Sequence, residues 1–125
     1  MDVNPVLPKG RPFIERYGPG GFRIGGTIYT GSVLILPDGV EIWPISSMAE
    51  ITPESLRPVA EHGGVEILLI GCGQRMQMVQ KPLRAALREV GVVIDAMDSG
   101  AVCRTYNVLV AEERRVAAAL LPLTA

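Results

Sequence analysis

The chain has 125 residues, of which 48% are hydrophobic and 20% are charged. Its 12 Lys and Arg residues nearly balance its 13 Asp and Glu residues, so no strong field favours nucleic acid or anionic lipid as a partner. This length suits one domain that folds without disulfides or metal ions, and no apolar run approaches the roughly 20 residues that span a bilayer. We therefore expect a cytoplasmic globular protein of bacterial type, without a transmembrane segment.

The first dozen residues contain three prolines and lack the apolar stretch of a secretion signal or the pattern of a transit peptide. We predict an extended or disordered tail over residues 1–12 and a single domain over 13–125. From 13 to 43, glycine-rich turns separate short strand-like stretches at 13–17, 22–24, 27–29, 32–36 and 41–43.

This alternation predicts antiparallel hairpins. Gly25-Gly26 and Asp38-Gly39 are the expected turns with positive φ, a conformation that residues with a Cβ adopt only at a steric cost.

The second half of the chain predicts a small parallel unit. Thr52-Pro53 is typical of a helix N-terminus, and Pro58 should keep that helix short or broken. Predicted strands at 65–70, 92–97 and 116–121 alternate with helices from near Pro82 to Gly91 and from Ser99 to about Glu113.

Such alternation favours parallel strands with right-handed crossovers. The fold class is therefore α/β, with N-terminal antiparallel hairpins that either pack on the β-α-β-α-β unit or continue its sheet. The pattern leaves the strand order open.

Ligands of open α/β sheets collect beyond the carboxyl ends of the parallel strands, so Gly71-Cys72-Gly73 and Asp98-Ser99-Gly100 should be neighbours. A helix that begins at Ser99 would point free amides there, with Arg104 about one turn farther on, which suits a small anion or carboxylate. The candidate ligand pocket comprises Gly71, Cys72, Gly73, Asp98, Ser99, Gly100, Cys103 and Arg104.

A purely structural interpretation of the same segment is the more frequent outcome. Asp98 or Ser99 would then only cap the helix and Gly100 would only allow close packing. Tyr106 and Asn107 would satisfy buried backbone groups. Arg104 would pair with a carboxylate, for which Asp95, Asp98 and Glu66 are the candidates.

Gly71-Cys72-Gly73 resembles the start of a dinucleotide-binding GxGxxG motif, but Met76 occupies the third glycine position and the next helix begins only near Pro82. We expect no dinucleotide or other cofactor. Cys72 and Cys103 lack metal-binding spacing, so no metal site is predicted either.

The side chains also provide no obvious reaction. Cys103 lies near a helix start, where a thiolate is stabilised, but no partner base is evident. His62, the one histidine, is typical of an exposed helix end. Cys72 and Cys103 would form a redox pair only if they lined one crevice, and two buried thiols are the commoner outcome. No catalytic residue is predicted.

Met76 and Met78 lie between the glycine segment and the following helix, where their flexible side chains suit a lid or a partner surface. Filling a gap in the core is the more frequent use of methionine. We take Met76 and Met78 as the candidate partner surface.

Several stretches together resemble a known family. Residues 97–109 read MDSGAVCRTYNVL, and further similarity lies in 17–22, 29–34, 51–56 and 68–73 and at Trp43. The chain resembles, over residues 13–121, the Mth938-like family of unknown function, which includes mitochondrial complex I assembly factor three and an adipogenesis-associated mammalian protein. Cys72 and Ser99 stand where this family more often has Thr, which weakens any requirement for a hydroxyl in the glycine segment.

The resemblance implies a three-layer β/α domain with no established enzyme activity. It also implies protein partners, namely subunits of respiratory complex I or another assembly factor, through which the protein would associate peripherally with the membrane. Two functions stay open. The first is a non-enzymatic interaction or assembly factor, and the second is a small-anion or small-molecule binder with cryptic enzyme activity.

Overall fold

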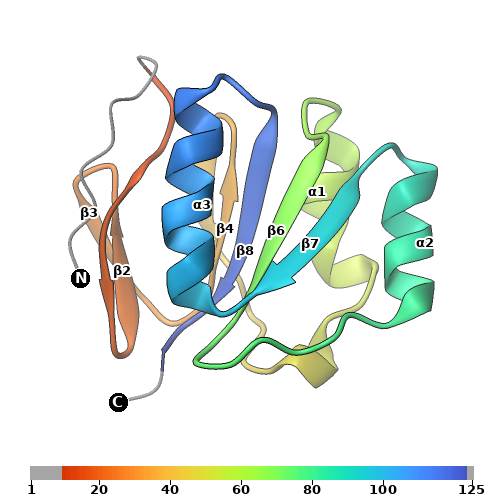
Figure 1. The fold of residues 1–125 in the computed structure, drawn as a ribbon, viewed down its shortest axis with the longest axis horizontal. Helices are drawn as coiled ribbons and strands as arrows, with labels where there is room; N and C mark the ends of the chain where they lie inside the picture. Colours follow the sequence, from red (N-terminus) through yellow and green to blue (C-terminus); the bar gives the residue numbers. More distant parts are fainter. Residues whose placement is uncertain (1–9, 124–125) are drawn as a thin grey trace.

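The computed structural model describes residues 10–123, so most of the predicted tail over 1–12 lies outside the described residues. Figure 1 shows the order and arrangement of the elements. The strands are β1 (Ile14–Gly18), β2 (Gly21–Ile24), β3 (Thr27–Thr30), β4 (Val33–Leu36), β5 (Gly39–Ile42), β6 (Ile67–Cys72), β7 (Val93–Met97) and β8 (Val116–Leu121). The helices are the short 3-10 turns η1 (Met48–Glu50) and η2 (Glu54–Leu56) and the α-helices α1 (Arg57–His62), α2 (Lys81–Glu89) and α3 (Ser99–Ala111).

The strands form two sheets. β1, β2 and β3 make an antiparallel sheet, and the larger sheet has the order β5-β4-β8-β6-β7. In that larger sheet β6 is parallel to both β7 and β8, whereas β4 is antiparallel to β5 and β8. The predicted α/β class is confirmed. Both alternatives for the N-terminal half also hold, because β4 and β5 continue the sheet while β1 to β3 form a separate one.

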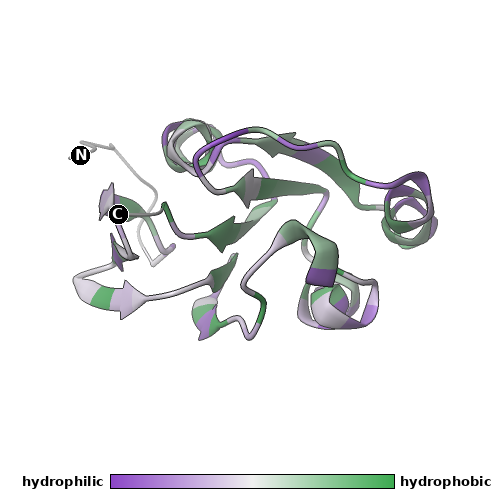
Figure 2. Cartoon of the chain, turned by 90° about the horizontal axis from the view of Figure 1, so that it is seen from below, coloured by the Kyte–Doolittle hydropathy of each residue, from purple (hydrophilic) through white to green (hydrophobic). Residues whose placement is uncertain are grey.

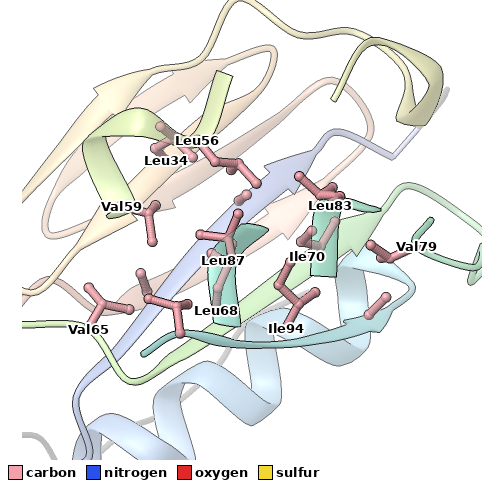
Figure 3. Packing of buried hydrophobic residues seen from close by; sticks show 14 of the residues in the cluster. Leu34, Leu56, Val59, Val65, Leu68, Ile70, Val79, Leu83, Leu87 and Ile94 are labelled. Atoms are coloured by element: carbon pink, nitrogen blue, oxygen red, sulfur yellow. The ribbon is translucent and has the colours of Figure 1, made fainter. Parts of the chain in front are cut away.

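The larger sheet divides the hydrophobic residues into two clusters, one on each face. The first cluster lies under α1 and α2 and includes Leu56, Val59, Leu68, Ile70, Leu83 and Leu87 (Figure 3). The second cluster lies under α3 and the three-stranded sheet and includes Ile14, Phe22, Leu69, Val102 and Tyr106. The result is a three-layer structure, and Figure 2 shows the hydrophobic colour concentrated on the central strands.

The central strand β8 explains why helices fit on both faces. Successive side chains of a strand point to opposite faces, and β8 is buried along its whole length. Ala117 and Ala119 belong to the first cluster, and Ala118 belongs to the second. Three small side chains in the middle of the sheet therefore leave room for bulkier residues from the helices on either side.

The edges of the larger sheet are short or charged. β5 has four residues and exposes Glu41, while β7 exposes Asp95 at its centre. None of the helices in the described part of the chain combines the length and apolar character needed to cross a bilayer.

The structure corrects two local predictions. Gly71 and Cys72 belong to β6 rather than to a loop, because they pair with Leu120 and Leu121 of β8. The hairpin between β4 and β5 turns at residues 37–38, since Leu36 pairs directly with Gly39, and Gly39 has no positive φ.

The helical segment after Thr52 is short and broken, as predicted, since the 3-10 turn η2 (Glu54–Leu56) precedes α1, which has six residues. Pro58 does not cause the break, because it lies in the first turn of α1, where a missing N–H group costs no helical hydrogen bond. The predicted Gly25-Gly26 turn is confirmed, with φ values of 55° and 86°.

Gly71 generates a stability prediction because β6 passes close to α3 there. A Cβ at Gly71 would lie 2.6 Å from Leu120 Cδ2 and 2.8 Å from Ser99 Oγ. Gly71→Ala is expected to lower the free energy of unfolding by about 1–3 kcal/mol, as overpacking does in other cores. Urea denaturation measures this difference.

Gly39→Ala is the matched control, because a Cβ there would meet no atom within 4 Å. Its effect should stay within roughly 0.5 kcal/mol. Equal effects of the two substitutions would contradict close packing at Gly71.

Candidate functional site

The carboxyl ends of the parallel strands point to the lower edge of the molecule in Figure 1, and Ser99 ties three of them together. Ser99 N donates to Gly73 O at 2.8 Å, and Gly73 N donates to Ser99 Oγ at 2.9 Å. The same hydroxyl donates to Leu121 O. The two predicted segments, 71–73 and 98–100, therefore do lie side by side, and Ser99 is fully buried between them.

The first turn of α3 has internal hydrogen-bond partners. Asp98 is the N-cap, and its Oδ1 accepts from Ala101 N at 2.9 Å. The Ser99 amide is bound by Gly73 O. Tyr17 covers the next residue, since a Cβ at Gly100 would lie 3.2 Å from its ring. Capping and close packing are thus the observed roles of Asp98 and Gly100, and two of the amides predicted to face an anion bind other parts of the chain.

Arg104 has a different partner from the three that the sequence suggested. Its side chain is exposed and donates to Tyr17 Oη rather than pairing, among the described residues, with Asp95, Asp98 or Glu66. Glu66 instead accepts from Arg114 at 3.2 Å and from Arg115 at 3.3 Å. These hydrogen bonds hold the pKa of Glu66 below its usual value.

The polar side chains of α3 fasten the N-terminal strand to the helix. Asn107 Oδ1 accepts from Ile14 N at 3.0 Å, and Asn107 Nδ2 donates to Ile14 O at 2.8 Å. Tyr106 Oη donates to Pro12 O at 3.0 Å. The structural interpretation of Tyr106 and Asn107 is confirmed. Asn107 gives Ile14 the donor and acceptor that a neighbouring strand would supply. We call Tyr106 and Asn107, with their bonds to Pro12 and Ile14, the clamp.

The two cysteines lie on opposite faces of the larger sheet. Cys72 belongs to the cluster under α1 and α2, and Cys103 belongs to the cluster under α3. They therefore cannot form the redox pair that a shared crevice would have allowed. Burial raises the pKa of Cys103 to about 12 and also raises the pKa of Cys72, so both thiols stay protonated near neutral pH.

His62 is remote from both thiols because it ends α1, at the amino end of β6. Its Nε2 lies 2.9 Å from Asp38 Oδ1, and its Nδ1 accepts from Gly64 N at 3.1 Å. The bond to His62 lowers the pKa of Asp38. His62 thus secures the turn after α1 and the turn between β4 and β5.

The predicted partner residues border a groove at the carboxyl end of the sheet. Met78 is 85% exposed and Met76 is 57% exposed. Beside them, two hollows of about 460 and 270 Å³ adjoin, since both are lined by Met48, Ala49 and Gln77. We call this feature the methionine groove. Its lining comprises Ser46, Ser47, Met48, Ala49, Ile51, Cys72, Gly73, Gln74, Arg75, Gln77, Met78, Val79, Gln80, Leu83, Leu121 and Pro122.

Sequence reasoning missed one wall of this groove. Met48, Ala49 and Ile51 come from the η1 region, more than twenty residues before the loop that carries Met78. Ile51 offered only a local signal, as a residue next to a helix start. No pattern in the sequence indicates that the η1 region lies beside the loop over 73–80.

Comparison with known proteins shows what the chain is similar to. The model of a family described as "Protein of unknown function (DUF498/DUF598)" matches residues 14–121. An uncharacterized protein of Rhodobacter capsulatus is 38% identical over 110 residues, which cover 88% of this chain and 84% of that protein.

Two vertebrate relatives carry the name NADH dehydrogenase [ubiquinone] 1 alpha subcomplex assembly factor 3. The Xenopus tropicalis protein is 34% identical over 111 residues, covering 88% of this chain and 61% of its own length. The human protein is 32% identical over 116 residues, covering 88% of this chain and 60% of its own length. The chain thus spans about three fifths of these two relatives.

Solved structures share the fold. A crystal structure described as an outer membrane protein from Bartonella henselae superposes with a TM-score of 0.85 at 37% identity, covering 94% of this chain and 99% of that one. A solution structure of a Mth938-like domain from Bordetella pertussis gives a TM-score of 0.81 at 28% identity, covering 98% and 92% of the two chains.

Asn107 provides a test of the clamp. Asn107→Ala would leave the buried N–H and C=O groups of Ile14 without partners, which is expected to lower the free energy of unfolding by roughly 2–4 kcal/mol. Urea denaturation measures the loss, and hydrogen exchange should show the Ile14 amide opening faster. Val108→Ala, one residue along α3 but exposed, should change stability by less than about 0.5 kcal/mol.

The thiols provide a second test. Both cysteines should resist an aromatic disulfide reagent at about pH 8 in the folded protein and react fully after denaturation. The Cys103→Ala variant reports on Cys72 alone, and Cys72→Ala reports on Cys103 alone.

The raised pKa of Cys103 also has a consequence for stability. The stability that this buried thiol contributes is fully present below the unfolded pKa of 9.0 and is lost as the pH rises toward the folded value of about 12. Rapid labelling of Cys103 at about pH 8 in the folded protein would contradict its burial.

Proposed function

The chain belongs to the DUF498/DUF598 family, and we propose that it is a protein-binding assembly factor rather than an enzyme. Support comes from the vertebrate relatives that are named as assembly factors of NADH dehydrogenase. The proposed partners are subunits of respiratory complex I or another of its assembly factors. We place the protein in the cytoplasm, where such partners would bring it to the membrane surface.

The observation that carries this proposal is the exposure of Met76 and Met78 beside the methionine groove. Exposed methionines leave apolar surface in water, and contact with a partner would remove that cost. Their flexible, polarizable side chains adapt to different partner surfaces. An assembly factor needs such contacts, because it must bind and later release its client.

The arrangement of reactive side chains supports a role without catalysis. Cys103 is fully buried, and burial raises the pKa of Cys72 as well. His62 is engaged with Asp38 and Gly64. Neither thiol therefore has the activating base that a nucleophile requires.

The alternative, a small-anion or small-molecule binder with cryptic enzyme activity, has less support. Such a site would use the amides at the start of α3 together with Arg104. The amides of Ser99 and Ala101 are bound by Gly73 and Asp98, and Arg104 is bound to Tyr17. A ligand would have to displace these internal hydrogen bonds.

The proposal predicts a phenotype. Deletion of the gene from the native host should lower membrane NADH:quinone oxidoreductase activity and the amount of assembled complex. A Met76→Asp/Met78→Asp variant should fail to restore either quantity. Methionine contacts of hot-spot quality are worth about 1 kcal/mol or more each, so the double substitution should weaken partner binding at least roughly tenfold.

The matched control is Ile28→Asp/Val108→Asp, because both residues are exposed and lie away from the groove. This variant should restore activity fully, and urea denaturation should show that both variants are folded. Unchanged activity and complex content in the deletion strain would refute the assembly function.

A further inference from the structure

We propose that the methionine groove accepts an acidic amphipathic segment of the partner protein, an inference that rests on the proposed protein-binding function. The apolar face of this segment would lie on the groove floor. Its carboxylates would face the loop over 73–80 and the start of α2.

The groove floor includes apolar side chains that are firmly held by the core. Val79 and Leu83 line the smaller hollow and are only 6% and 8% exposed, because their side chains also belong to the core cluster under α2 (Figure 3). Met48 and Ile51 on the opposite wall pack against the same cluster. The floor is therefore a continuation of the core, which suits apolar anchors of an amphipathic helix. Met78 adds an adaptable rim.

One wall of the groove, formed by the loop over 73–80 and the start of α2, is basic, with Arg75 as the charged residue in the groove lining itself. Between Glu66 and Glu89 the sequence has no acidic residue and four basic ones, Arg75, Lys81, Arg84 and Arg88. Arg75 lines the larger hollow, and Lys81 begins α2 directly after Gln80, which lines the smaller one. Arg75 and Lys81 are both exposed. Arg84 is fixed by its hydrogen bond to Ile94 O at 2.6 Å. Since the whole chain has a net charge of −1, this basic wall is a local feature.

The acidic group of the opposite wall is engaged in its own turn. Glu50 Oε2 accepts from Ser46 Oγ at 2.8 Å, from Ser46 N at 3.2 Å and from Ser47 Oγ at 3.2 Å. These hydrogen bonds lower the pKa of Glu50 and hold its carboxylate on the η1 side. Carboxylates of a partner segment would complement the cations of the facing wall, which favours orientation and encounter.

An NMR titration of the full chain tests this partner chemistry. The probes are two synthetic amphipathic helices with the same leucine face, one with glutamate and one with lysine on the polar face. The glutamate peptide should give saturable shifts confined to residues 46–51 and 73–83. The lysine peptide should bind at least about tenfold more weakly.

Charge reversal is the decisive variant. Arg75→Glu/Lys81→Glu should invert the preference toward the lysine peptide, whereas Arg57→Glu/Arg115→Glu, which changes two exposed arginines elsewhere, should leave it unchanged. Equal binding of both peptides, shifts away from the groove, or no binding of either peptide would overturn the inference. Groove shifts with phosphatidylglycerol vesicles but not with the glutamate peptide would overturn it in favour of a lipid surface.

The peptide titration tests the acidic partner, and the complementation assay tests the assembly function, so a negative result in one does not imply a negative result in the other. Absence of peptide binding, with a methionine variant that still fails to restore activity, would remove the acidic partner and leave the assembly function. Specific binding of the glutamate peptide, with a methionine variant that restores activity, would support the groove chemistry and count against the assembly function.

Discussion

The pairing of Asn107 with both backbone groups of Ile14 is the constraint on which much of the molecule depends. A buried N–H or C=O group without a partner costs about 1–3 kcal/mol, so the helix and the strand are fixed relative to one another. That placement sets the three-stranded sheet against α3 and brings Tyr17 over Gly100. The polar side chains Tyr106 and Asn107 of α3 thus serve the internal architecture rather than a ligand.

Successive side chains of the central strands point to opposite faces of the larger sheet, so the reactive side chains on one face cannot contact those on the other. Cys72 and Cys103 face opposite layers, so neither can assist the other, and each is surrounded by apolar residues. The proposed partner surface lies at the rim of the sheet, where loops leave the layers. The methionine groove occupies that rim at the carboxyl ends of the strands.

Much of the fold could be predicted because its signals are local. The apolar run over 116–121 coincides with β8, and the helix from Ser99 ends within two residues of its predicted end. Strand order could not be predicted, because the pattern does not show which face each crossover helix covers. Gly71 and Cys72 were misplaced because glycine usually ends a strand, whereas here its lack of a Cβ lets α3 approach β6. The groove wall formed by Met48 and Ile51 depends on a contact between residues far apart in the sequence, and such a contact produces no periodic hydrophobic pattern.

The short or charged edge strands of the larger sheet affect how the protein behaves at high concentration. An incoming strand from another molecule would meet Glu41 on short β5 or Asp95 on β7, and charge on an edge discourages such additions. Apolar side chains exposed to water favour association between molecules at high concentration. Met76 and Met78 lie on a loop, which lacks the extended backbone that seeds amyloid-like growth, whereas the exposed Ile42 and Val93 lie on the edge strands that carry Glu41 and Asp95.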